Sequence, residues 1–466
     1  MGYESWAGPP FGGVNINFIN STADTSYSSR GMNFNATNAV ICNIAGELLF
    51  YSNGVYIANK NNDTLLNGGG LNPGPFVNNF GVYGLPIPQG NLIIPLPGDS
   101  NKYYLFHEVA TVLGSLFTPL ELFFSTIDMN LDNGLGGIIS KNNIVLQDAL
   151  ELGELTAVKH ANGRDWWLLC HKVNSDKFYK LLISPYGMGV STQNYGTVRD
   201  DYGGASSFSP DGSKFAHYNS STDLDIYDFD RCSGMLSNYT NIPINDSAAF
   251  GAIAFSPNSQ ILYAASTLYV YQFDLTSSNI AATKQTIATW DGYYSPAFPL
   301  ASTFYLPQLA PDGKIYINCT NSTVDIHVIN YPDSLGMFCD LQQHSVHLPA
   351  YNAFTIANHP NYFLGALAGS PCDSLTPVKE ITNNTIPIRI NPNPAQNTFY
   401  LNYELPYGKT AVATIYNNLG EAVLKRNLYW YFGYLQIDCS ALDNGVYIIK
   451  VETKEYGSSA KLVIAR

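Results

Sequence analysis

The stretch FSPDGSKFAHY, from Phe208 to Tyr218, decides the fold of this 466-residue chain. In the turn SPDG, proline presets φ at the second position and glycine closes the fourth, which is type I turn chemistry. Apolar and polar residues then alternate, as in a β-strand with one buried face. The stretch therefore predicts two antiparallel strands joined by a tight turn.

The same turn and strand recur along the chain. Two further clear copies are FSPNSQILYAA at Phe255 and LAPDGKIYINC at Leu309, and each of the three is followed by a second alternating run. Fainter copies turn near Gly46, Asn101, Gly163 and Asn361, so the seven turns are 47 to 62 residues apart. Units of this length made of short strands indicate a β-propeller, with one four-stranded sheet for each blade.

We predict an all-β fold in which residues 1–370 form a propeller of seven blades, with six or eight as alternatives. The unit around Asn361 meets a linker soon after its second strand, so it needs outer strands from elsewhere. The run VNINFIN, from Val14 to Asn20, is the expected donor, because such closure removes an exposed sheet edge. No amphipathic helix is expected. The FSPDG copies resemble the repeats of TolB-like propellers, a likeness that says nothing about activity.

The pattern changes after residue 370. Residues 371–387 are rich in Pro, Ser, Thr and Asn and are predicted to be a linker. Residues 388–466 contain short strands that suit one small β-sandwich. A hairpin is expected to turn at Asn418-Leu419-Gly420. Two sets of alternating residues predict buried strand faces, namely Phe399, Leu401, Tyr403 and Leu405, and Tyr447, Ile449 and Val451.

Four ordered motifs mark this last module: NPNP at Asn391, IYNNLGEAV ending at Val423, IDCSALDNGVY at Ile437 and KLVI at Lys461. With these motifs the module resembles the type A C-terminal sorting domain of type IX secretion substrates in Bacteroidota. Two departures are Asn417, where an acidic residue is common, and the ending Ala465-Arg466, where lysine is often last. The matching residues are Pro392, Asn393, Pro394, Gly420, Asp438, Leu442, Gly445, Tyr447 and Lys461. The alternative is an adhesive immunoglobulin-like sandwich.

The resemblance implies export. The chain would cross the inner membrane with a signal peptide, and the folded protein would cross the outer membrane with the type IX machinery as its partner. The sorting domain would then be removed, and the passenger released or fixed to surface lipopolysaccharide. No signal peptide follows Met1, so Met1 is expected to be a processed or recloned start. The stretch from Gly46 to Gly74 also resembles uncharacterised propellers found upstream of such domains.

Composition excludes several other classes. The formal net charge is −13, with 23 Lys and Arg against 36 acids, so no nucleic-acid partner is expected. The longest apolar runs are too short to span a bilayer, which needs about 20 residues. Seven cysteines make an odd number, so at least one is free or pairs between chains, beside one or two disulfides.

No catalytic residue, metal site or cofactor is predicted. The chain has no G-x-S-x-G, H-E-x-x-H or P-loop motif. Cys170 and His171 are neighbours in a strand and so point to opposite faces, which excludes a thiol–imidazole pair between them. His344 and His347 are three residues apart, and in an extended strand they also face opposite ways.

A ligand is expected where the inner strands begin, around the central channel. Aromatic rings and carboxylates would suit the stacking and hydrogen bonding of a sugar, or the capture of a cation or amine. The segments concerned supply Glu154, Asp200, Asp201, Tyr202, Asp246, Trp290, Asp291, Tyr293, Tyr294, His347 and Tyr351. The alternative is that these aromatic residues pack blade against blade.

Three functions therefore remain open. The first is a non-enzymatic module, secreted or on the outer cell surface, that binds glycan or a surface protein. The second is a secreted polysaccharide hydrolase or lyase that uses acids such as Asp201 and Asp291. The third is a structural envelope protein. The motif of Asp, then Ser or Thr, then an apolar residue is similar to the O-glycosylation acceptor of Bacteroidota and occurs at Thr64, Ser247, Ser334 and Ser374.

Overall fold

The computed structural model describes residues 1–18, 23–113, 116–199, 204–219, 223–248, 250–296, 299–373, 386–405, 409–429, 432–453 and 456–466. The chain divides into two compact units, Met1–Ser374 and Leu375–Arg466. Most of the linker predicted at 371–387 lies outside the described residues, so its bounds stay a prediction.

Five successive segments of the first unit each form one four-stranded antiparallel sheet. In each sheet neighbouring strands follow one another along the chain, so every connection is a local turn. The first two sheets are β7 Asn91–Pro95, β8 Lys102–Leu113, β9 Leu116–Asp128 and β10 Gly137–Gln147, then β11 Thr156–Lys159, β12 Trp166–His171, β13 Ser175–Ser184 and β14 Gly187–Arg199. The next two are β15 Ala205–Phe208, β16 Lys214–Asn219, β17 Asp223–Asp230 and β18 Met235–Ile242, then β19 Gly251–Phe255, β20 Ile261–Ser266, β21 Tyr269–Asp274 and β22 Gln285–Thr289. The fifth is β23 Pro307–Leu309, β24 Ile315–Ile317, β25 Thr323–Ile329 and β26 Leu341–Asn352.

Two three-stranded sheets precede them. Their strands are β1 Gly2–Tyr3, β2 Gly12–Asn17 and β3 Asp24–Ser28, then β4 Ala39–Cys42, β5 Leu48–Ser52 and β6 Ile57–Asn59. One short α-helix, α1 (Pro75–Phe80), lies between β6 and β7, where no helix was expected. Single 3₁₀ turns are η1 Ser5–Ala7, η2 Asp132–Gly134, η3 Ile280–Thr283 and η4 Gly336–Cys339.

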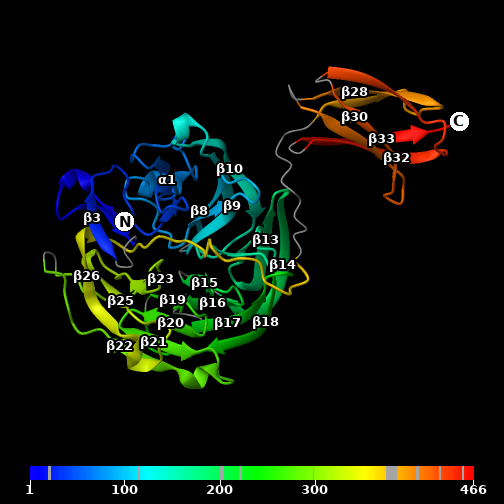
Figure 1. Cartoon of the computed structure of the whole chain (residues 1–466). Helices are drawn as coiled ribbons and strands as arrows, with labels where there is room; N and C mark the ends of the chain where they lie inside the picture. Colours follow the sequence, from blue (N-terminus) through cyan, green and yellow to red (C-terminus); the bar gives the residue numbers. More distant parts are fainter. Residues whose placement is uncertain are drawn as a thin grey trace. The chain divides into compact units, whose positions relative to one another are not determined.

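The seven sheets follow one another around a common centre (Figure 1). The first strands of successive sheets touch, as β11, β15, β19 and β23 do in turn. Apolar clusters fill the spaces between neighbouring sheets; Phe106 of one sheet, for example, shares a cluster with Trp166 of the next. The N-terminal sheet packs on β26 through Val14 and Leu348, and the backbone N–H of Phe34, before β4, donates to its Gly2. The N-terminal sheet thus lies between the β23–β26 sheet and the β4–β6 sheet.

The repeated turns are confirmed at six of the seven predicted positions. Each joins the first two strands of its sheet, as the turn at Gly212 joins β15 to β16. Gly212 has φ 74°, a left-handed conformation that favours glycine. A Cβ there would also lie 2.7 Å from the side chains of Arg231 and Val158, so space as well as conformation requires glycine.

The predicted repeat around Asn361 is wrong. Residues 353–373, all of them described, contain no strand. The run at Val14 is also not an outer strand of that repeat, because β2 lies in the middle of its own sheet, between β1 and β3. Sequence spacing alone could not reveal that this repeat is absent, since asparagine residues such as Asn361 are common both in hairpin turns and in loops.

Residues 353–373, here called the central segment, run along the first strands instead of forming a sheet. The side chain of Asn358 donates to the carbonyls of Asn91 and Leu155, at 2.9 Å each, so it joins two sheets. Further along, the Tyr362 hydroxyl donates to Ile93 and the Leu367 backbone to Ala161. The chain therefore fills the centre of its own ring of sheets.

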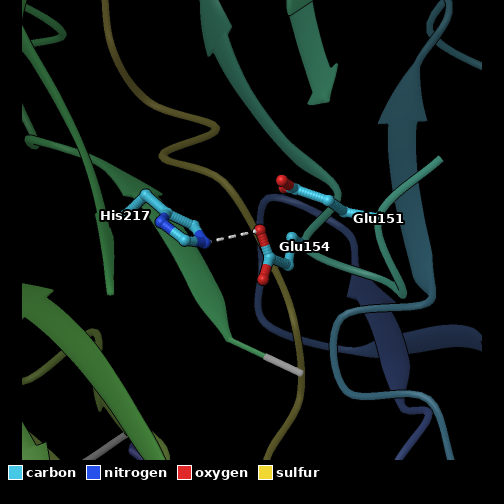
Figure 2. Close-up of side chains that lie close together, drawn as sticks. All are labelled: Glu151, Glu154 and His217. Atoms are coloured by element: carbon cyan, nitrogen blue, oxygen red, sulfur yellow. Dashed lines mark ion pairs between the residues drawn. The ribbon is translucent and has the colours of Figure 1, made fainter. Parts of the chain in front are cut away.

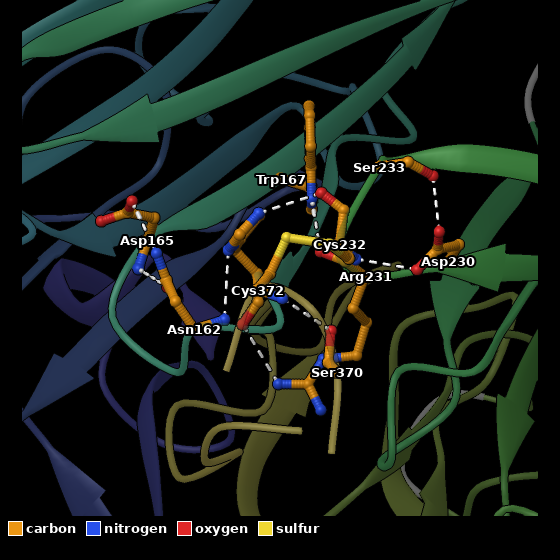
Figure 3. The surroundings of a disulfide bond; sticks show 10 residues. Asn162, Asp165, Trp167, Asp230, Arg231, Cys232, Ser233, Ser370 and Cys372 are labelled. Atoms are coloured by element: carbon orange, nitrogen blue, oxygen red, sulfur yellow. Dashed lines mark hydrogen bonds between the residues drawn. A yellow bond between two sulfur atoms is a disulfide. The ribbon is translucent and has the colours of Figure 1, made fainter. Parts of the chain in front are cut away.

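The seven cysteines form one disulfide, Cys232–Cys372, with a Cα–Cα distance of 5.5 Å. It ties the end of the central segment to the turn between β17 and β18 (Figure 3). Beside it, Arg231 donates to Lys159 at 2.8 Å and to the central-segment carbonyl of Gly365. Cys42, Cys170, Cys319, Cys339 and Cys439 are free.

The second unit has two antiparallel sheets that enclose one apolar core. One is β27 Ile388–Asn391, β28 Thr398–Glu404 and β31 Phe432–Asp438, and the other is β30 Ala422–Leu428, β29 Ala411–Tyr416, β32 Gly445–Glu452 and β33 Gly457–Ile464. Both predicted sets of alternating residues are buried in this core, including Phe399 and Leu401 from one sheet and Ile449 and Val451 from the other.

None of the helices in the described part of the chain is long and apolar enough to cross a membrane.

Candidate functional site

Five of the predicted ligand residues come together at one place on the first unit. They lie between β22 and β26, at the end of the sheets where the first strands begin. Two further residues, Asp325 of β25 and His344 of β26, complete the group. We call it the rim patch, defined as Trp290, Asp291, Tyr293, Tyr294, Asp325, His344 and His347.

Hydrogen bonds and ring contacts fix the rim patch. The carboxylate of Asp291 lies 2.8 Å from Nε2 of His344, and the ring of Tyr293 stacks on His344 with centroids 4.0 Å apart. The Tyr293 hydroxyl donates to Asp325 at 3.3 Å. Asp325 is also 3.0 Å from Nδ1 of His347. Two Asp–His pairs thus flank one tyrosine.

The expectation that His344 and His347 face opposite ways is wrong. A bulge in β26 shifts its register against β25, so that Ile326 pairs with Val346 but Val328 pairs with Gln342. His344 has φ 40° within this bulge. Bulges redirect side chains in this way and are common beside functional sites. Both imidazoles consequently take part in the rim patch, each with its own carboxylate.

The rim patch offers both exposed and buried groups. The side chain of His347 is 73% exposed whereas that of Asp325 is 5% exposed. Tyr294 is 52% exposed, and its ring meets Trp290 edge-on at 5.5 Å. Burial opposes the charged form of Asp291, but the hydrogen bonds from His344 and from the Tyr293 backbone, with the charge of His344, together outweigh it, and the pKa of Asp291 lies below its ordinary value. The patch therefore presents an ionised carboxylate, an imidazole and an aromatic face to solvent.

Of the other predicted ligand residues, those that the structure describes do not join the rim patch. Asp200, Asp201 and Tyr202 lie outside the described residues. Asp246 accepts hydrogen bonds from Ser266 and Tyr271 and so belongs to the β19–β22 sheet. Tyr351 is buried against Phe11, with ring centroids 5.5 Å apart, in keeping with the packing alternative for this residue.

Glu154 lies in a second, buried group. The carboxylates of Glu151 and Glu154 lie beside the imidazole of His217, which comes from β16 (Figure 2). One carboxylate oxygen from each glutamate and one ring nitrogen of His217 all lie within 4.8 Å of one another. Glu154 is 3.0 Å from Nε2 of His217 and accepts from the Gly204 backbone at 2.9 Å. We call these three residues the buried cluster.

Two further charged groups adjoin the buried cluster. His171 lies 2.7 Å from Glu151, and Arg199 lies 3.7 Å from it on the other carboxylate oxygen. Burial, then Arg199 and His217, lower the pKa of His171 well below its ordinary value. Burial favours neutral Glu154, but His217 and Arg199 together keep its pKa below the ordinary value. Sequence reasoning placed Glu154 near a ligand but missed its partners, because they come from three separate segments.

The motif residues of the second unit tie its ends together. The side chain of Asn393 donates to the Lys461 carbonyl and accepts from the Val463 backbone, at 2.8 Å each, which joins the NPNP motif to β33. Asn417 caps the predicted hairpin turn, where Gly420 has φ 80°. Tyr447 donates to the Asp443 carbonyl at 3.0 Å, which closes the DNG turn before β32.

Residues 389–465 match a family model, that of the secretion system C-terminal sorting domain. The second unit is this sorting domain. The protein is therefore exported by the type IX secretion system and is secreted or attached to the outer cell surface. The sorting domain implies contact with the type IX machinery, as the sequence predicts. No curated protein matches the chain.

Several solved structures resemble the chain at low identity. A candidate 6-phosphogluconolactonase from Bacteroides fragilis NCTC 9343 is 12% identical with a TM-score of 0.38, covering 68% of this chain and 96% of its own. A functionally unknown protein from Desulfotomaculum acetoxidans DSM 771 is 12% identical with a TM-score of 0.36, covering 74% and 95%. A gluconolactonase from Xanthomonas campestris is 11% identical with a TM-score of 0.33, covering 62% and 84%. These scores are too low to transfer an activity.

Removing the sorting domain should stop export. The test compares the full chain with a chain that ends at residue 388, both expressed in a Bacteroidota host behind the same signal peptide. The shortened chain should remain inside the outer membrane, because it lacks the sorting domain that the type IX machinery recognises. Immunoblots of the medium, the protease-accessible cell surface and the periplasm measure this. Equal surface or medium levels of the two chains would contradict the assignment.

The predicted O-glycosylation residues of the passenger remain predictions. Thr64 and Ser247 are exposed, and Ser334 is partly exposed with its carbonyl accepting from Gln272 at 2.8 Å. Ser374 lies outside the described residues.

Proposed function

We propose that the passenger is a seven-bladed β-propeller that binds glycan outside the cell, delivered there by a β-sandwich sorting domain. The seven sheets around a common centre support this propeller, and the two sheets with one core support the sandwich. The central segment occupies the middle of the ring, so the ligand is expected at the rim and not within the channel.

The observation that carries the proposal is the rim patch. Sugars present apolar C–H faces and rows of hydroxyl groups, so their sites combine an aromatic ring with charged or polar acceptors. Tyr294 supplies the exposed ring, and Asp291 supplies an ionised acceptor that His344 holds in place. His347 adds a hydrogen-bonding group 3.0 Å from Asp325. This combination favours glycan over a protein partner, because a stable protein interface uses roughly 20–30 residues on each side.

A second candidate is a secreted polysaccharide hydrolase or lyase. The pair formed by Asp325 and His347 favours it. The buried carboxylate of Asp325 lies beside Nδ1 of His347 and orients the exposed imidazole, which is the arrangement of a histidine that acts as a general base. The two proposals differ in whether the ligand is changed, and we rank binding first because the chain has none of the common nucleophile motifs.

A glycan array tests the site. The full chain should capture a defined set of polysaccharides, and Tyr294→Ala or Asp291→Ala should reduce the signal at least tenfold, roughly the loss of one good contact at 1.4 kcal/mol. Tyr186→Ala is the matched control, because Tyr186 is 89% exposed on the β13–β14 turn, far along the chain from the patch. Equal losses in all three variants, or none, would reject the rim patch as the site.

A further inference from the structure

The geometry points to a metal site: we propose that Glu151, Glu154 and His217 hold one divalent transition-metal ion. Two carboxylates and one imidazole are a ligand set that such ions accept, and here the three ligand atoms lie within 4.8 Å of one another. Figure 2 shows the three side chains converging from the segment before β11 and from β16. All three are buried, at 2%, 5% and 0% exposure.

The charge of the surroundings supports a cation. The carboxylates of Glu151, Glu154 and Asp225 face a single guanidinium, that of Arg199. Three carboxyl groups thus lie beside one guanidinium in an almost fully buried region, which is costly, and a divalent ion would add positive charge next to Glu151 and Glu154.

Arg199 cannot supply this compensation alone. Its Nε donates to Asp225 at 3.1 Å and its Nη2 to the Tyr227 hydroxyl at 3.2 Å, so two of its nitrogens are held by β17. Its nearest atom to Glu151 is 3.7 Å away, beyond a normal hydrogen bond. Arg199 therefore engages Asp225 more closely than it engages Glu151.

The backbone fixes the two glutamates before any ion binds. Glu154 has φ 61°, a left-handed conformation that is uncommon for glutamate and recurs at functional sites. The preceding Gly153 has φ 81°, and its N–H donates to the buried carboxyl of Glu108 at 3.0 Å. A Cβ on Gly153 would lie 1.9 Å from the Pro88 carbonyl, so this loop is tightly seated. Preorganised ligands reduce the entropy that ion binding must overcome.

A small cavity adjoins the buried cluster. Its accessible volume is about 10 Å³, at the lower end of what a single water molecule needs, and its lining includes Glu154, His171, Arg199 and Ser206. A water there could complete the coordination shell with the protein ligands. No sugar ring fits so small a space, so the proposed ion is independent of the glycan site at the rim patch.

The mixed ligand set selects the class of ion. Calcium and magnesium prefer oxygen ligands throughout, whereas imidazole together with carboxylate suits Zn²⁺ and Mn²⁺. Protons are the competitors, since they can neutralise the same groups, and metal affinity should therefore fall as the pH is lowered.

Metal analysis of the full chain tests the proposal. The wild-type protein is first stripped with a chelator and then dialysed against Zn²⁺ or Mn²⁺. It should retain one ion per chain, as measured by inductively coupled plasma mass spectrometry. The variants Glu154→Gln and His217→Gln should bind at least about tenfold more weakly. Thermal unfolding should show a metal-dependent rise in Tm for the wild type that both variants lose.

Asp165→Asn is the matched control. Asp165 is a buried carboxylate that pairs with Arg164 at 2.7 Å and lies outside the ligand set. The variant should keep the wild-type ion content. A folded wild-type protein that retains no ion above the dialysis buffer overturns the proposal whatever the variants do. So does a folded Glu154→Gln or His217→Gln protein with undiminished affinity.

Discussion

Replacing Cys372 by serine should lower the free energy of unfolding of the first unit by about 3 to 5 kcal/mol. The Cys232–Cys372 disulfide closes a loop of 140 residues, and a cross-link across so long a loop strongly restricts the unfolded chain. It also holds the last residues of the central segment against the turn after β17 (Figure 3). Without it, that segment keeps only its hydrogen bonds and packing.

Urea unfolding of the Cys372→Ser variant beside the wild type measures this effect. Cys42→Ser is the control, since Cys42 is a free and exposed cysteine, and it should cost far less. A thiol reductant should lower the stability of the wild type toward that of Cys372→Ser and leave the variant unchanged. Equal stability of oxidised wild type and variant would mean that the cross-link contributes nothing to the ring of sheets.

Acid should destabilise the first unit through its buried neutral histidines. Burial lowers the pKa of His107 to about 3 and that of His327 to about 4. In the unfolded chain histidine has a pKa near 6.5, so below that pH the unfolded state binds protons that the folded state cannot. Stability therefore rises with pH through this window. At pH 5 each of these histidines costs about 2 kcal/mol relative to pH 7.

Hydrogen bonds hold both buried imidazoles in place. His107 lies 2.6 Å from the amide oxygen of Asn72 and 3.0 Å from the Ser125 hydroxyl. His327 accepts from the backbone N–H of His344 at 3.0 Å. Urea unfolding at pH 7, 6 and 5 gives the slope, and His107→Gln should reduce it by about one proton. A free energy of unfolding that does not change between pH 7 and pH 5 would contradict these assignments.

The sequence predicts the repeating part of the fold well because each unit carries its own local signal. A turn such as the one at Gly212, followed by alternating residues, specifies a hairpin without reference to the rest of the chain. The central segment has no such signal of its own. Asn358 and Tyr362 find their partners on β7 and near β11 only once the sheets surround them.

The candidate sites show the same division. The aromatic and acidic residues from Trp290 to Tyr294 stand together in the chain, so the sequence singles them out. His344 joins them only through a bulge in β26, whose register depends on pairing with β25. Glu151 and Glu154 are three residues apart, but His217 comes from the next sheet and Arg199 from the end of β14, and no spacing rule connects these segments.

The central claim is that the exported passenger binds a glycan at the rim patch without converting it. Isothermal titration of the glycan captured on the array, followed by mass spectrometry of the recovered ligand, tests this most directly. We predict saturable binding with the glycan recovered unchanged, and loss of that binding in Tyr294→Ala with Tyr186→Ala unaffected. Cleaved glycan in the recovered material, or full binding by Tyr294→Ala, would contradict the account.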